Sequence, residues 1–172
     1  MKVLAFCGSL RRLSMNAALL RASARLAPAD MTIELFDGLG ALPLFNPDLE
    51  AAMPSAVGRM HRAIEASDAL LIASPEYAHG VTGVLKNALD WLVSFEGFVH
   101  KPVAIFNASP RSLHADAALR ETLVTMSARL LSECCLDLPL RGSGLDEEQI
   151  FSTHAPAIRD ALRRLALGVR NE

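Results

Sequence analysis

The residues best suited to chemistry lie in a polar loop near the start of the chain, Gly8–Asn16, which reads Gly-Ser-Leu-Arg-Arg-Leu-Ser-Met-Asn. The loop supplies serine hydroxyls, guanidinium groups and free backbone N–H groups, all of which bind anions. A helix is expected to follow directly, and its N-terminal N–H groups and positive dipole end would add to this attraction. The loop therefore predicts a site for a phosphate-bearing ligand.

A simpler interpretation of this loop stays open, in which Ser14 and Asn16 only cap the helix and Arg11 and Arg12 are solvated. Two nucleotide-binding motifs are excluded by the spacing. The sequence contains neither the Gly-x-Gly-x-x-Gly pattern of dinucleotide sites nor the Gly-x-x-x-x-Gly-Lys-Ser/Thr pattern of Mg-nucleotide loops.

A second loop, Ser74–Gly83, combines a rigid proline, an aromatic ring and glycines that let a planar ligand approach main-chain N–H groups. Glu76 could cap the helix after Thr82, orient the loop, or be a solvated charge. His79 could touch a substrate or face solvent, and the second case is commoner for a loop histidine. A planar ring on this loop, with its phosphate in the first loop, is what flavin mononucleotide (FMN) requires.

The elements that position these loops follow from an alternation of apolar runs and helical patterns, which is typical of α/β folds. Strands are expected at 2–7, 31–36, 68–73, 102–108 and 135–138, and helices at 16–26, 56–66, 82–95, 113–133 and 155–169. This predicts a flavodoxin-like, doubly wound sandwich: a five-stranded parallel sheet of order 2-1-3-4-5 with helices on both faces. Ligands of such folds lie outside the carboxyl ends of the strands. There the two loops meet the exit of the fourth strand, Asn107–Ser112.

The length of 172 residues predicts a single domain, 1–172. A net charge of −2 provides no basic field for nucleic acid or an anionic membrane, and no window approaches the roughly 20 apolar residues that span a bilayer. Three cysteines, two of them adjacent, form neither a disulfide framework nor a metal motif, and the histidines show no ligand spacing. We therefore expect a cytoplasmic protein without a metal site and without membrane or nucleic-acid partners.

Two separated motifs resemble the NADPH-dependent FMN reductase family, which includes bacterial quinone, azo-dye and chromate reductases. They are Gly-Ser-Leu-Arg-x-x-Ser-x-Asn at 8–16, and Ser-Pro-Glu-Tyr at 74–77 followed by Gly-Val-Leu-Lys-Asn-Ala-Leu-Asp-Trp-Leu at 83–92. The resemblance spans nearly the whole chain. It implies a flavodoxin-like fold, bound FMN, NADPH or NADH as electron donor, and a homodimer or homotetramer with the flavin near the subunit interface.

The resemblance also assigns roles to residues. The FMN phosphate and ribityl chain would be surrounded by Ser9, Arg11, Ser14, Met15 and Asn16. The isoalloxazine ring would lie along Pro75, Glu76, Tyr77 and position 78, with Ser109 at its edge. The helix that carries Lys86, Asn87, Asp90 and Trp91 would be mostly architectural.

Three departures from the family pattern concern the site. Ala78 replaces a common Asn, Thr82 replaces a common Pro, and the fourth-strand loop reads Ser-Pro-Arg-Ser at 109–112 where many relatives carry consecutive glycines. The loss of the amide at Ala78 removes one polar ring contact. Arg111 could partly fill the substrate face or meet the 2′-phosphate of NADPH.

The function implied is transfer of two electrons from a nicotinamide, by way of the flavin, to a small acceptor such as a quinone. The cofactor supplies the difficult chemistry, so no catalytic side chain is assigned. Two alternatives share the fold: a non-enzymatic electron carrier, which would usually be more acidic, and a relative that has lost its flavin affinity. A tyrosine phosphatase with a Cys-x5-Arg loop is disfavoured, since counting from Cys7 places Leu13 where the arginine is required.

Overall fold

The structure is a computed structural model that describes residues 1–170, and a parallel sheet forms its centre. Its main strands are β1 (Lys2–Cys7), β2 (Thr32–Leu35), β3 (Ala69–Ala73) and β6 (Pro102–Asn107), which pair in the order β2-β1-β3-β6. Strands β3 and β6 are buried along their whole length, as expected for apolar strands covered on both faces. The predicted α/β class and strand order are confirmed.

Two short pieces, instead of one continuous strand, hold the fifth position of the sheet beside β6. Strand β7 (Arg129–Leu130) pairs with the start of β6 and β8 (Leu136–Asp137) with its end, and the 3-10 helix η4 (Ser132–Cys134) separates them. The strand predicted at 135–138 corresponds to β8. Strand β7 falls within the predicted helix 113–133, so that helix prediction was wrong beyond residue 125.

Helix α4 (Leu113–Thr125) ends early because the backbone turns left-handed at Ser127, where φ is +60°. The Ser127 N–H donates to the Val124 carbonyl at 2.9 Å, and the Ala128 N–H donates to the Leu123 carbonyl at 3.0 Å. Glycine usually provides this helix-ending motif. Because a serine stands here instead, no residue type in the sequence marks the end of the helix.

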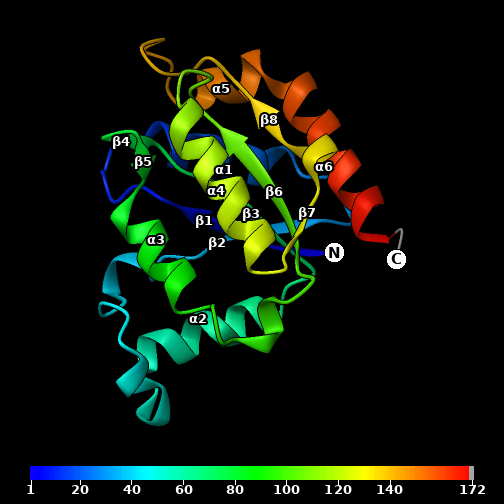
Figure 1. Cartoon of the computed structure of the whole chain (residues 1–172). Helices are drawn as coiled ribbons and strands as arrows, with labels where there is room; N and C mark the ends of the chain where they lie inside the picture. The colour runs from blue at the N-terminus through cyan, green and yellow to red at the C-terminus, as the bar shows by residue number, and fades with distance from the viewer. Residues whose placement is uncertain (171–172) are drawn as a thin grey trace.

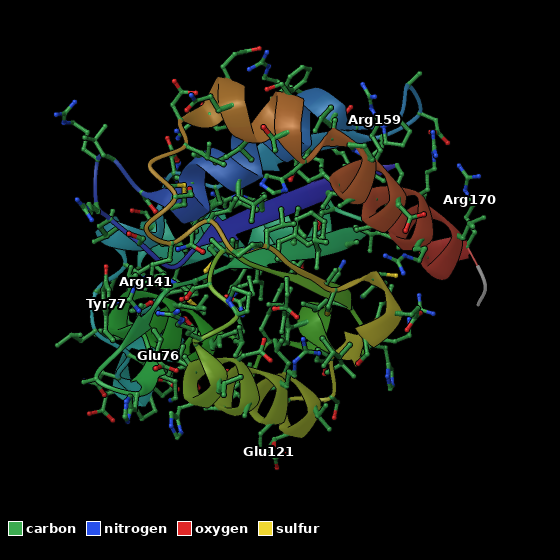
Figure 2. All side chains as sticks on the ribbon, turned by 90° about the horizontal axis from the view of Figure 1, so that it is seen from above. Glu76, Tyr77, Glu121, Arg141, Arg159 and Arg170 are labelled. Carbon is green, nitrogen blue, oxygen red and sulfur yellow. The ribbon has the colours of Figure 1, made fainter. Side chains whose placement is uncertain are left out.

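Helices cover both faces of the sheet (Figures 1 and 2). On one face lie α1 (Met15–Leu26), α5 (Glu147–Thr153) and α6 (Ala155–Arg170), and on the other α2 (Ser55–Glu65), α3 (Gly83–Asp90) and α4. Successive side chains of β1 alternate between the two cores: Val3 and Ala5 face the first, and Leu4 and Phe6 the second. No helix described within residues 1–170 is long and apolar enough to cross a bilayer.

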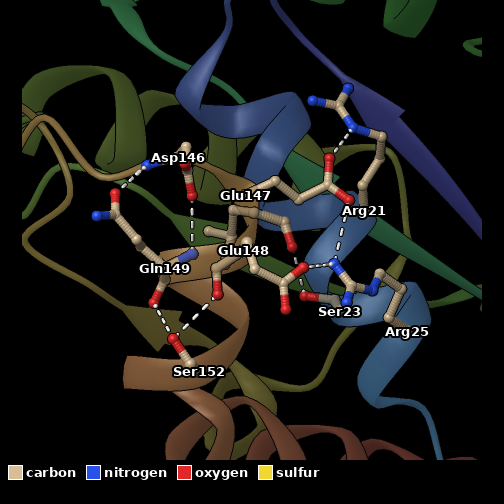
Figure 3. A network of polar contacts seen from close by, with 9 residues as sticks. Arg21, Ser23, Arg25, Asp146, Glu147, Glu148, Gln149 and Ser152 are labelled. Atoms are coloured by element: carbon tan, nitrogen blue, oxygen red, sulfur yellow. Dashed lines mark hydrogen bonds and ion pairs between the residues drawn. The ribbon is translucent and has the colours of Figure 1, made fainter.

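Helix α5 was not predicted, and polar contacts hold it to α1 (Figure 3). The Arg21 Nε donates to Glu147 at 2.5 Å, and Arg25 pairs with Glu148 at 2.7 Å. A capping box between Asp146 and Gln149 closes the helix N-terminus. These contacts fix the loop that enters α5 at the carboxyl end of the sheet.

The long connection 37–55 contains the 3-10 helices η1 (Leu39–Ala41) and η2 (Pro47–Ala52), and α3 anchors it. The Pro43 carbonyl accepts hydrogen bonds from Asn87 at 3.0 Å and from the buried Trp91 indole at 2.8 Å. These side chains of α3 and its C-cap therefore serve the architecture. Helix α3 ends at Asp90, earlier than predicted, and the chain continues through η3 (Glu96–Phe98).

Candidate functional site

A cavity of about 480 Å³ opens at the carboxyl ends of β1, β3 and β6. Four separate segments line it: the first loop, the loop after β3, the exit of β6, and the loop before α5. Its lining residues are Ser9, Arg11, Leu13, Ser14, Met15, Asn16, Ser74, Pro75, Glu76, Tyr77, Ala108, Ser109, Ser112, Arg141, Gly142 and Gly144. The structure thus brings together the residues singled out for the cofactor, with the exception of Ala78.

In the first loop, Ser14 both caps α1 and lines the cavity. Its Oγ accepts a hydrogen bond from the Ala17 N–H at 3.3 Å. Asn16, in the first turn of α1, is 6% exposed, and its Oδ1 has no hydrogen-bond partner among the described residues. No carboxylate within residues 1–170 lies within 4.0 Å of the Arg11 guanidinium. The loop therefore holds polar groups that the chain itself does not satisfy.

Gly8 shows how closely the first two loops approach each other. A Cβ at this position would lie 2.1 Å from the Ser74 Oγ and 2.6 Å from the Ser74 Cβ. The Gly8 N–H donates to the Ala73 carbonyl at 2.9 Å, and the Ser74 Oγ lies 3.4 Å from the Thr82 Oγ1. A glycine is needed where these two loops meet beside the site.

The loop after β3 forms a hairpin of β4 (Glu76–Tyr77) and β5 (Gly80–Val81). Its turn residues Ala78 and His79 both have left-handed backbones, with φ of +49° and +59°. Positive φ at both central positions is characteristic of a type I′ hairpin turn. Neither residue lines the cavity, and the His79 ring stacks on that of His114 at 4.4 Å between centroids.

Glu76 links the hairpin to α4. Its Oε2 accepts a hydrogen bond at 2.8 Å from the Ala115 N–H, in the first turn of that helix. A carboxylate here satisfies a free N–H group and faces the positive end of the helix dipole. Of the alternatives considered from sequence, Glu76 caps a helix, but the helix is α4, not the one after Thr82. Tyr77, beside it, is 56% exposed at the rim of the cavity.

Sequence reasoning missed the fourth segment of the site, which contributes Arg141, Gly142 and Gly144. The two glycines have φ of +79° and +72°. Figure 2 shows Arg141 on the same side of the molecule as Glu76 and Tyr77, far from Arg170. The available signal was topological, since a loop leaving the fifth strand emerges at the same edge of the sheet as the loops from the other strands.

Arg111 does not line the main cavity. It lies in a neighbouring cleft of about 440 Å³, together with Ser109, Pro110, Pro139, Arg141 and Gly142. The cleft shares Ser109, Arg141 and Gly142 with the main cavity. The two spaces are therefore adjacent, and Arg141 stands between them.

Cys134, Cys135 and the possible metal ligands take no part in the candidate cofactor site. Burial raises the pKa of the Cys134 thiol to about 11, and burial also raises the pKa of Cys135, so both thiols stay protonated near neutral pH. Neither lines the cavity. Among residues 1–170 there is no group of three or more His, Cys, Asp or Glu side chains arranged to hold a metal ion.

Comparison with known proteins assigns the site to a family. The model of the NADPH-dependent FMN reductases matches residues 1–137, which include the first loop, the hairpin and the exit of β6. The chain belongs to this family. The resemblance seen in the two motifs is thereby confirmed, with its flavin-dependent use of NAD(P)H.

Individual relatives agree with the family assignment. An NAD(P)H-dependent FMN reductase of Pseudomonas aeruginosa is 43% identical over 138 residues, covering 77% of this chain and 74% of the relative. A quinone reductase of Pseudomonas putida is 37% identical over 139 residues, covering 77% and 72%. Among solved structures, the flavoenzyme NAD(P)H:(acceptor) oxidoreductase FerB of Paracoccus denitrificans superposes with a TM-score of 0.77 at 27% identity, over 96% of this chain and 97% of FerB. These relatives are named as enzymes, which supports a flavin-dependent oxidoreductase over a non-enzymatic electron carrier.

Proposed function

We propose that this protein binds FMN in the main cavity and uses it to pass electrons from NAD(P)H to a small quinone-like acceptor. The observation that carries the proposal is the pairing of the 480 Å³ cavity with unsatisfied polar groups at one end of it, above all the buried Asn16 Oδ1. When bound, the flavin supplies the hydride chemistry. The chain supplies binding, orientation and access.

The phosphate end of the site is the first loop. Arg11 would neutralise the phosphate, and the hydroxyls of Ser9 and Ser14 and the first turn of α1 would donate hydrogen bonds. Asn16 lines the same space and has an unpartnered buried amide oxygen, to which a ribityl hydroxyl would donate. The residues present therefore fit the cofactor that the family uses. Met15 adds an apolar wall.

The ring end of the site is the hairpin with the exits of β6 and β8. Pro75, Glu76 and Tyr77 line the cavity from the segment after β3, and Ser109 lines it from the exit of β6. The bond between Glu76 and the N-terminus of α4 fixes the hairpin, so Glu76 acts as a positioning residue. No side chain is proposed as catalytic, because hydride transfer between two stacked rings requires alignment and exclusion of water.

The test is an absorbance spectrum of the purified protein before and after addition of FMN, followed by anaerobic NADPH and then a quinone. We expect bound-flavin bands that bleach with NADPH and return with the quinone. Bands that resist bleaching would indicate a flavoprotein without reductase activity. The absence of any flavin binding would overturn the proposal.

We also infer that the protein forms a homodimer or homotetramer. Leu44 is 84% exposed, and Met53 and Val93 are also exposed. The Ser94 Oγ donates to Glu50 at 2.6 Å, which ties η2 to the segment after α3 that carries Val93. Exposed apolar side chains of this kind can be covered by a second copy of the chain. Light scattering should give a multiple of the 18.5 kDa chain mass, and Leu44→Glu should shift it toward the monomer.

Two further expectations accompany this function. We infer a cytoplasmic location from the pattern of unpaired cysteines, to be tested by cell fractionation. We also infer that residues 1–172 form one FMN-binding domain, for which limited proteolysis of the flavin-loaded protein should yield no stable smaller fragment.

A further inference from the structure

The cleft of about 440 Å³ beside the flavin cavity has no role in the function proposed so far. It borders the cavity, with which it shares the lining residues Ser109, Arg141 and Gly142. A compact acceptor stacked on a flavin ring would occupy the cavity alone. The cleft is therefore suited to a longer substrate, of which one part lies at the flavin and another part lies to the side.

The cleft carries uncompensated positive charge. Its only charged lining residues are Arg111 and Arg141, both exposed, and no carboxylate of residues 1–170 lies within 4.0 Å of either guanidinium. Elsewhere the chain pairs arginines internally, as with Arg21 and Glu147 or Arg120 and Asp116. The two cleft arginines thus keep their donors for a ligand, and two guanidinium groups together match a dianion.

The backbone holds the two arginine-bearing segments together. The Arg141 N–H donates to the Ala108 carbonyl at 3.1 Å, and the Leu140 N–H donates to the same oxygen. The Ser112 N–H donates to the Ser109 carbonyl at 2.9 Å, which closes the turn that carries Arg111. The backbone positions of both arginines are therefore fixed before a ligand arrives, so only their side chains lose freedom on binding.

We propose that Arg111 and Arg141 form a subsite for the 2′-phosphate of NADPH and make this protein select NADPH over NADH. This inference rests on the function proposed above. The two donors differ only in a phosphate monoester on the adenosine ribose, remote from the reacting nicotinamide. An arginine near the ribose is the usual means of accepting that phosphate, and the offset cleft with two free arginines provides it here.

The first test compares Arg111→Ala with Arg163→Ala. Arg163 is an exposed arginine on α6 that lines a different groove, so its loss changes the net charge equally. For Arg111→Ala we expect the ratio of kcat/KM for NADPH to kcat/KM for NADH to fall about 10- to 100-fold, through KM for NADPH. Arg163→Ala should leave the ratio unchanged, and Arg111→Lys should restore part of it.

The second test measures binding without turnover. Calorimetry on the FMN-loaded protein should show adenosine 2′,5′-bisphosphate binding more tightly than AMP, with the difference reduced in Arg111→Ala. The same comparison should be made for Arg141→Ala, with its FMN affinity measured in parallel, because Arg141 also lines the flavin cavity. Rising salt should weaken bisphosphate binding more than AMP binding.

The outcomes separate this inference from the function beneath it. A wild-type protein that binds no flavin would overturn the proposed function itself. A protein that binds FMN and oxidises NADH, but whose donor ratio and bisphosphate affinity do not change in Arg111→Ala, would overturn only the subsite. An effect of Arg111→Ala confined to KM for anionic acceptors would also overturn it, because the cleft would then serve the acceptor.

Discussion

Polar groups at the two ends of the parallel sheet are satisfied in different ways. At the amino end, the Lys2 N–H donates to Asp68 at 2.6 Å, and the Lys101 ammonium donates to the carbonyls of Ile64 and Ser67 at 3.1 and 2.8 Å. At the carboxyl end, the Asn16 Oδ1 has no partner among the described residues, and no carboxylate described lies near Arg11. In these examples the amino end is closed by bonds within the chain, whereas the carboxyl end keeps polar groups for a ligand.

This difference teaches where stability and binding reside in the fold. Every parallel strand enters at the same end and leaves at the other, so the loops that can gather around a ligand all lie at the exit end. Substitutions at the amino end should therefore change the free energy of unfolding and leave flavin affinity alone. Substitutions in the carboxyl-end loops should change flavin affinity and leave the free energy of unfolding unchanged, except where the loops pack on each other.

The largest effect is expected for Gly8→Ala, because Gly8 lies where two of the carboxyl-end loops pack on each other. The new Cβ would overlap Ser74, so the first two loops must move apart. We expect FMN affinity to fall more than about 100-fold and the free energy of unfolding to fall by about 1–3 kcal/mol. Flavin titration and urea denaturation measure both. Gly83→Ala is the control, since nothing lies within 4 Å of a Cβ there, and normal behaviour of Gly8→Ala would contradict the tight approach of the loops.

Arg11→Ala should weaken FMN binding by about 10- to 100-fold, because it removes a charged hydrogen bond to the phosphate. The stability of the flavin-free protein should stay the same, since Arg11 has no ion pair to lose. Arg12→Ala is a matched control in the same loop, because Arg12 does not line the cavity. Equal losses in the two variants would mean that only the general charge of the loop matters.

Lys101→Met tests the amino end. It keeps the apolar stem but removes the donor to the carbonyls of Ile64 and Ser67, so the free energy of unfolding should fall by about 1–2 kcal/mol. Partial burial removes some of the water around the ammonium and lowers the pKa of Lys101. Chemical denaturation and flavin titration should show loss of stability with unchanged FMN affinity. A change in FMN affinity would contradict the view that the amino end affects stability and only the carboxyl end affects binding.

Ala78→Asn should stabilise the protein by about 0.5–1 kcal/mol, because asparagine tolerates the left-handed backbone that Ala78 adopts at +49°. Thermal unfolding of the flavin-free protein measures this. Ala78→Val serves as the opposite control, since a β-branched residue resists positive φ. A stabilisation by both variants would exclude the backbone as its cause.

The smallest effect concerns acid stability at the amino end. The hydrogen bond from Arg170, followed by a backbone hydrogen bond, lowers the pKa of Asp30 below its usual 3.8. The folded state therefore favours the carboxylate, and this stabilisation is present above pH 3.8 and is lost as the pH falls through the folded pKa. Arg170→Ala should flatten that part of the stability curve, measured by thermal unfolding. If the two proteins lost stability equally at acid pH, the pair of Asp30 and Arg170 would contribute nothing to the pH dependence of stability.

Much of the fold could be predicted because its signals are local. Buried strands appear as short apolar runs, and the loop that follows each strand is read directly from the sequence. The end of α4 could not be predicted, since it depends on a left-handed serine, Ser127, whose conformation is set by packing. The division of the fifth strand by η4 is likewise a tertiary effect, because the pieces are too short to show a pattern.

The site was predictable where a motif and the topology agreed, as in the first loop. Arg141 lies in a turn whose residues suggest only a change of direction, and its place beside Ser109 depends on pairing of β8 with β6. Glu76 caps a helix 39 residues further along the chain, a contact that no local pattern records. Ala78 follows the motif, but the hairpin turn removes it from the cavity lining.

The division of the fifth strand also affects how this sheet meets other protein chains. An uninterrupted edge strand presents a row of free N–H and C=O groups onto which a foreign strand can add. Here that edge consists of two pairs of residues, β7 and β8, interrupted by η4, and the opposite edge, β2, is only four residues long. Neither edge gives a long template for intermolecular β-pairing, which guards the molecule against aggregation through its sheet.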